Sequence, residues 1–141
     1  MTRKPSLFQL PLSLLGAVGL VAVSSHPALA HHSFPAAFDA TKPVVVTGVM
    51  KEVRLSNPHS MFVVDVTDAA GKVETWRFEG STPSSLIRSG FKPGSVKAGD
   101  RVTVKGSHAR DMTQNFAAAR EIVTTDGKSF IVGPAGDEAT P

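Results

Sequence analysis

The sequence predicts a small, mainly β domain: an OB-like barrel of five to six strands with one short helix between strands three and four. Outside the first 30 residues the chain keeps 14 valines but only two leucines, a composition that favours strands over helices. Strand-like runs and turn signals alternate from residue 43 to 132. The single helix signal falls after the third run, which is its place in an OB barrel. A small β-sandwich is the alternative, but it gives the helix no defined place.

Residues 1–30 have the layout of a secretory signal peptide. Arg3 and Lys4 precede an apolar stretch over 7–23, and Ala-Leu-Ala at 28–30 is a small-residue cleavage signal. A membrane anchor is the alternative, but the stretch is interrupted by proline and glycine and is barely long enough to span a bilayer. We therefore expect cleavage after residue 30, a periplasmic location, no membrane contact afterwards and a mature chain that begins at His31.

The mature chain divides into an amino-terminal arm (31–42), a barrel domain (43–132) and a tail (133–141) that we expect to be disordered. Phe34 and Phe38 are spaced to pin the arm to the body. Gly48 predicts a bulge or bend within the first strand. Alternating apolar positions and turn residues predict the following strands: Val44–Leu55, Met61–Thr67, Val73–Glu79, Val102–Ser107, Phe116–Thr124 and Ser129–Val132.

The helix signal is short and specific. Thr82 can cap the helix, Pro83 suits its first position, and Gly90 can end it. The intervening two turns predict that Leu86 and Ile87 are buried.

Composition excludes several kinds of chemistry. The chain has no cysteine, which rules out disulfides, zinc–thiolate sites and a cysteine nucleophile. Without the leader, 13 basic residues face 12 acidic ones, so the balance offers no basic stripe and we expect no nucleic-acid partner. No serine-hydrolase elbow or phosphate loop is present, and we expect binding rather than catalysis.

Four histidines of the mature chain are candidate metal ligands: His31, His32, His59 and His108. Cleavage would give His31 an α-amine whose pKa of about 8 lets a metal ion displace its proton. This amine, the His31 ring and one further imidazole from His59 or His108 would form a three-nitrogen set suited to Cu(II). In a second mode, His32 would supply its imidazole next to the amine. An OB barrel is expected to bring the loops near His59 and His108 to the same side, and thioethers such as Met61 and Met112 also favour a copper ion.

Other interpretations remain open for the same residues. His31 and His32 can follow the cleavage site without a role, His59 can simply stabilise its turn, and His108 can be a half-exposed histidine at a strand end. The barrel can then bind a small non-metal ligand, an envelope glycan or an envelope protein partner. A copper-dependent redox enzyme is a third alternative, although the chain lacks the flat aromatic face that an enzyme acting on polysaccharides would need.

Several segments resemble a family of small secreted bacterial proteins of unknown function. The most specific are His31-His32-Ser33-Phe34 and Asn57-Pro58-His59, and the resemblance covers nearly all of residues 31–132. It is supported by Phe78-Glu79-Gly80-Ser81, the helix region 84–90, Ala98-Gly99-Asp100-Arg101-Val102 and residues 117–121. The chain departs from the family pattern at Ala98, where proline is usual, and at Met112. The resemblance implies a periplasmic, barrel-like protein and supplies no activity.

Overall fold

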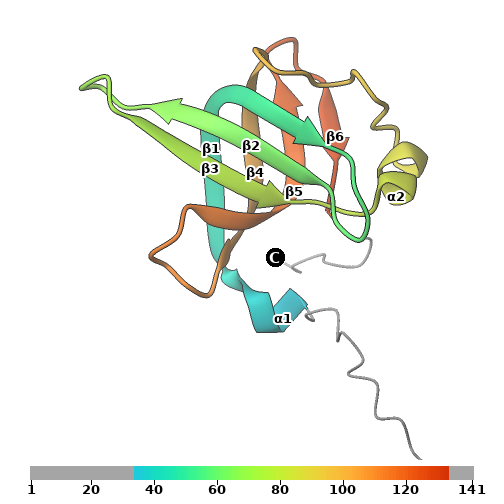
Figure 1. Ribbon diagram of the computed structural model, residues 1–141, viewed down its shortest axis with the longest axis horizontal. Helices are drawn as coiled ribbons and strands as arrows, with labels where there is room; N and C mark the ends of the chain where they lie inside the picture. The colour runs from blue at the N-terminus through green and yellow to red at the C-terminus, as the bar shows by residue number, and fades with distance from the viewer. Residues whose placement is uncertain (1–33, 134–141) are drawn as a thin grey trace, which may run out of the picture. The chain divides into compact units, whose positions relative to one another are not determined.

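Six strands and two short helices form residues 34–133, the part of the chain that the computed structural model describes (Figure 1). Strands hold 52% of these residues and helices 10%, which confirms the mainly β class. The elements are α1 (Phe34–Ala37), β1 (Phe38–Arg54), β2 (Met61–Thr67), β3 (Val73–Glu79), α2 (Pro83–Arg88), β4 (Arg101–Ala109), β5 (Phe116–Thr124) and β6 (Ser129–Ile131). The predicted leader (1–30), His31, His32 and the tail from residue 134 lie outside the described residues.

The sheet closes on itself as an OB-like barrel. The strand order is β3-β2-β1-β4-β5-β6, and neighbouring strands in this order pair antiparallel. The barrel is closed by a parallel pairing between β3 and β5, in which Phe78 lies opposite Ala117. α2 lies in the connection from β3 to β4, as the sequence predicts. The extra strand, β6, pairs with residues 121–123 of β5, which follow the residues that pair with β3.

Large apolar side chains fill the barrel. Phe62 and Phe91 meet edge to face with their ring centroids 5.6 Å apart, and Phe91 makes a similar contact with Phe130. The largest fully buried side chains among residues 34–133 are those of Met50, Ser60, Phe62, Val64, Phe78, Leu86, Phe91, Val96, Val102, Val104, Ile122 and Val132. Burial of this apolar surface is the main source of stability in a chain that has no cysteine to cross-link.

β1 is longer than the sequence predicts. It begins at Phe38 instead of Val44, because Phe38 pairs with Ala109 at the end of β4. The expected bulge does not lie at Gly48, since the register shift falls between Met50 and Glu52. Gly48 is required for close packing instead: a Cβ there would come within 2.3 Å of the Asp65 carbonyl oxygen on β2.

α2 begins and ends as predicted, but one of its side chains is not buried as expected. Thr82 caps the helix by accepting a hydrogen bond from the Ser85 amide at 3.3 Å, and Gly90 follows its end with a φ of 94°. Leu86 is buried, whereas Ile87 is 50% exposed, so its predicted burial is wrong. A helix of six residues presents one narrow face to the barrel, and consecutive residues point about 100° apart.

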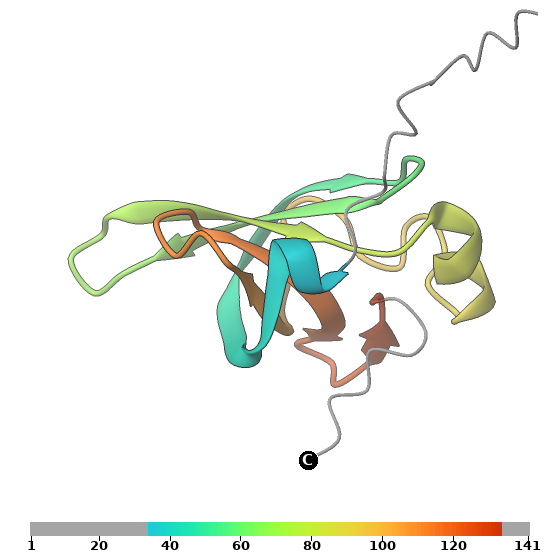
Figure 2. The same ribbon diagram turned by 90° about the horizontal axis from the view of Figure 1, so that it is seen from below.

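α1 is anchored to the outside of the barrel by a second apolar cluster. This amino-terminal cluster consists of Phe34, Ala37, Phe38, Ala109, Phe116 and Ala118. The Phe38 ring lies 5.4 Å from both the Phe34 and the Phe116 rings. Arg110 Nε donates a hydrogen bond to the Pro35 carbonyl oxygen at 2.6 Å, and seen from below α1 lies across the lower surface of the barrel (Figure 2). No helix within residues 34–133 has the length and apolar character needed to cross a membrane.

Candidate functional site

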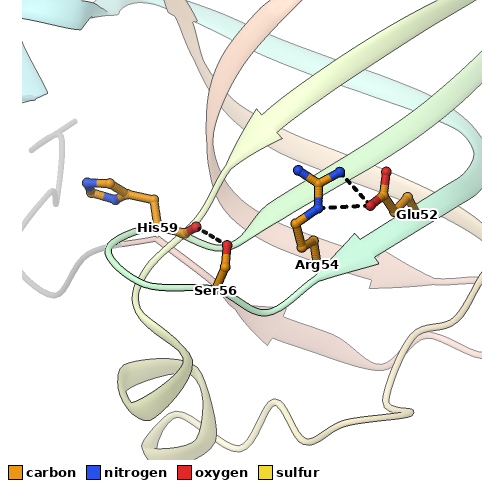
Figure 3. Close-up of polar contacts among 4 residues, drawn as sticks. All are labelled: Glu52, Arg54, Ser56 and His59. Carbon is orange, nitrogen blue, oxygen red and sulfur yellow. Dashed lines mark hydrogen bonds and ion pairs between the residues drawn. The ribbon is translucent and has the colours of Figure 1, made fainter.

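His59 lies in the loop between β1 and β2, and backbone contacts on both sides hold this loop in place. The next residue, Ser60, donates its amide to the Ser81 carbonyl oxygen at 3.1 Å and accepts from the Gly80 amide at 2.8 Å. Ser56 Oγ donates to the His59 carbonyl oxygen at 2.9 Å (Figure 3). The β1–β2 loop is therefore fastened to the segment that follows β3, and the position of His59 is fixed by that attachment.

The His59 imidazole lies within ion-pair distance of the Glu79 carboxylate at the end of β3. Nδ1 lies 3.3 Å from Oε1, and the side chains are 44% and 27% exposed. Phe78 points into the barrel and is fully buried, so its neighbour Glu79 faces outward. The carboxylate at the outer end of β3 thus lies beside an accessible imidazole from the β1–β2 loop.

Met61 lies on the same outer face. It pairs directly with Glu79 across the β2–β3 ladder, and its neighbour Phe62 points into the core. Directly opposed side chains on one face of an antiparallel pair have their Cβ atoms about 5 Å apart. His59, Met61 and Glu79 therefore form one patch, here called the outer-face patch.

His108 differs from its predicted environment. It lies next to the last residue of β4 but is only 8% exposed, so the expectation of a half-exposed ring is wrong. Its ring meets that of Trp76 edge to face with centroids 5.6 Å apart, and Nδ1 lies 2.8 Å from the Ala109 carbonyl oxygen. Extension of β4 to Ala109, beyond the predicted end at Ser107, aligns His108 with Ala117 of β5 and turns its ring inward.

His59 and His108 are on opposite faces of the barrel wall. His108 aligns through Ala117 with Phe78, which is an inward position, whereas His59 contacts Glu79, which is an outward one. Among residues 34–133 there is no group of three or more His, Cys, Asp or Glu side chains arranged to hold a metal ion. A site built on His59 would therefore take its further ligands from other kinds of group or from residues preceding Phe34.

The amino-terminal cluster lies next to the outer-face patch. Ala118 of β5 belongs to this cluster and pairs with Glu79 across the parallel β3–β5 closure, so their backbones are about 4.8 Å apart. Phe34 belongs to the same cluster. The described chain thus begins close to the strand whose Glu79 contacts His59.

Glu79 is the site residue that sequence reasoning missed. Scattered carboxylates give no paired spacing along the chain, and the contact with His59 follows from the β2–β3 register rather than from proximity in sequence. The available signal was the strict alternation of Trp76, Phe78 and their neighbours in β3, which places Glu79 outside the barrel.

Residues 18–117 match a family of unknown function, DUF6152. The chain belongs to this family. The match spans the barrel from β1 to the first two residues of β5, and it includes all four predicted histidine ligands together with Met61 and Glu79. It confirms the expected family of unknown function. A comparison with curated proteins gives no match.

Proposed function

We propose that this DUF6152 protein is exported to the periplasm and binds Cu(II) through His31 and His59. Cleavage after residue 30 would release the His31 α-amine. The amine and the His31 ring would chelate one ion, and the His59 imidazole would add a third nitrogen, a set that suits the tetragonal preference of Cu(II). The protein would hold or transfer the metal rather than catalyse a reaction.

One observation supports this proposal above the others: the amino-terminal cluster lies beside β3, the strand that carries Glu79, which contacts His59. Phe34 belongs to this cluster, and the cluster contacts β3 through the pairing of Ala118 with Glu79. Three peptide units separate His31 from Phe34, and these can extend about 10 Å. The proposal requires this length to bring the mature amino terminus to the outer-face patch.

Glu79 would act as the positioning residue for His59. Its carboxylate lies against Nδ1, so the ring would ligate the metal through Nε2. Metal-bound histidines commonly donate their other ring nitrogen to a carboxylate, which fixes the tautomer and the orientation of the ring. The contact with Glu79 would therefore orient His59 for ligation.

The other two histidines have different places in this proposal. His108 is left out of the ligand set because its ring is buried on the inner face against Trp76. His32 would supply the imidazole of the second mode, in which the amine, the intervening amide and the side chain bind one ion. A His32→Ala variant separates the two modes, because it would weaken binding only in the second.

The test is a Cu(II) titration of the mature protein against a form that retains Ala28-Leu29-Ala30 before His31, which leaves no histidine within the first three positions. The extended form removes the six-membered chelate of the His31 amine and ring and should bind at least tenfold more weakly, with a changed electron paramagnetic resonance spectrum. His59→Ala should weaken binding as well, while Lys97→Ala, on a distant turn, should not.

Equal Cu(II) binding by the mature and the extended forms would overturn the amino-terminal site, and unchanged binding by His59→Ala would remove His59 from it. Protein purified from the periplasm without metal, and with a thermal stability that copper does not alter, would favour the alternative of a barrel that binds a non-metal ligand or an envelope partner.

A further inference from the structure

We infer that the outer-face patch also binds Cu(I), with the Met61 thioether and the His59 imidazole as its ligands. The inference rests on the proposed function in taking copper as the metal, and it adds a second oxidation state and a sulfur ligand. It is carried by the placement of Met61 relative to His59 and Glu79.

His59, in the loop, precedes Met61 by two residues, and both side chains are at least partly exposed. The residues that alternate with them, Ser60 and Phe62, are both fully buried. In an extended chain, residues two apart share a face and lie about 7 Å apart along the strand. Two side chains with metal-binding atoms therefore stand next to each other on the outer face where β2 begins.

Glu79, on the neighbouring strand, is close to both residues. It is the direct cross-strand partner of Met61 and contacts His59 Nδ1 at 3.3 Å. Met61 is partly exposed, whereas Met50 of β1 fills the core. The position of Met61 on the accessible face is unusual for a methionine that serves only as packing.

The cation on the other side of Met61 is already paired. Arg54 is the partner of Met61 on β1, and its guanidinium would repel a metal ion. Arg54 Nε and Nη2 both donate to Glu52 Oε1, at 3.0 Å and 2.6 Å. In Figure 3 the Arg54 and Glu52 side chains lie together, and the His59 imidazole points away from them. The Arg54 charge is therefore paired with the Glu52 carboxylate.

The patch combines ligands of two kinds. A thioether is a soft ligand that favours Cu(I), an imidazole suits both oxidation states, and the nitrogen set at the mature amino terminus favours Cu(II). His59 would be common to both sites. Each ion would be bound in the oxidation state in which it arrives, without electron transfer by the protein.

The test measures Cu(I) affinity without oxygen, by competition with bicinchoninate, on protein exported and processed by the cell. Met61→Leu removes the sulfur and keeps a side chain of similar volume. It should weaken Cu(I) binding at least tenfold and leave Cu(II) affinity within twofold of the parent. Met112→Leu is the matched control, since Met112 lies in a polar loop and is 59% exposed, and it should change neither affinity.

X-ray absorption provides an independent readout. The Cu(I)-loaded parent should show a sulfur neighbour of the metal that is lost in Met61→Leu and kept in Met112→Leu. Unchanged Cu(I) affinity in Met61→Leu, or an equal loss in both variants, would overturn the inference. Loss of Cu(I) binding in Met61→Leu, together with equal Cu(II) binding by the mature and extended forms, would support the inference while refuting the amino-terminal Cu(II) site.

Discussion

The imidazole of His108 meets the indole of Trp76 edge to face, with the two ring centroids 5.6 Å apart. Trp76 is the only tryptophan of the chain and also stacks on Phe78, with centroids 5.9 Å apart. Edge-to-face and offset stacked contacts of this kind stabilise beyond the area that they bury. His108 therefore contributes to the packing on the inner face of the barrel. The fluorescence of Trp76 can be used to follow changes around His108.

We expect His108→Ala to lower the free energy of unfolding by about 2 kcal/mol, because it leaves a cavity beside Trp76. Copper binding should be unchanged. Urea unfolding followed by Trp76 fluorescence measures the first effect and a Cu(II) titration the second. His59→Ala is the matched control, and loss of its exposed ring should cost less than about 0.5 kcal/mol. A stable His108→Ala protein that fails to bind copper would return His108 to the ligand set.

Gly106→Ala should prevent stable folding or cost more than about 4 kcal/mol. A Cβ at Gly106 would lie 1.8 Å from the Ala118 carbonyl oxygen on β5, so β4 and β5 would have to separate. Gly71→Ala is the comparison: its Cβ would meet open space, but its φ of 82° should cost about 1–2 kcal/mol. Circular dichroism during thermal unfolding ranks the two variants, and equal losses would contradict the packing argument.

Asp126 should stay ionised to unusually low pH. Hydrogen bonds from Lys128 and then from Thr124 lower the pKa of Asp126 from 3.8 to about 2. Because the folded pKa is below that of the unfolded chain, the associated stabilisation is present above about pH 4 and is lost as the pH falls towards about 2. Carboxyl resonances followed by NMR should show this pKa rising in Lys128→Met. Lys72→Met should leave it unchanged, and a similar rise in both would indicate a general charge effect.

Phe34→Ala should loosen α1 and weaken Cu(II) binding several-fold, since an amino terminus that is no longer anchored loses more freedom when it binds. The Phe34 ring lies in the amino-terminal cluster and not in the barrel core, so the midpoint of urea unfolding should change little. Limited proteolysis should cut the variant faster before Phe38, and a Cu(II) titration measures the affinity. Ile87→Ala, which removes an exposed side chain from α2, is the control. Unchanged affinity in a readily cleaved Phe34→Ala protein would show that anchoring does not contribute.

Local patterns predicted most of the barrel. β2, β3 and β5 have the bounds that alternation indicates, and the Thr82 cap and the loop around Asp68 are encoded within a few residues. Asp68 Oδ1 accepts from the Ala70 and Lys72 amides at 2.8 Å and 2.9 Å, as its turn composition suggests. Turn chemistry and side-chain alternation act between near neighbours, so they can be read without a partner strand.

What the sequence could not show depends on distant partners. The start of β1 at Phe38 requires Ala109, and the burial of His108 requires Trp76 from another strand. The contact between His59 and Glu79 requires the β2–β3 register. These relationships are fixed by the pairing of strands and by closure of the barrel, which no local pattern contains.

The parallel pairing of β3 with β5 also sets the order in which the molecule can be completed. Arg77 lies opposite Phe116 and Glu79 opposite Ala118, so one side of β3 keeps unpaired backbone groups until the last fifth of the chain is present. Contacts between such distant segments make folding slow. For a chain exported as proposed, the residues that precede β5 would remain incompletely folded during transport across the membrane. They would reach the native fold only in the periplasm.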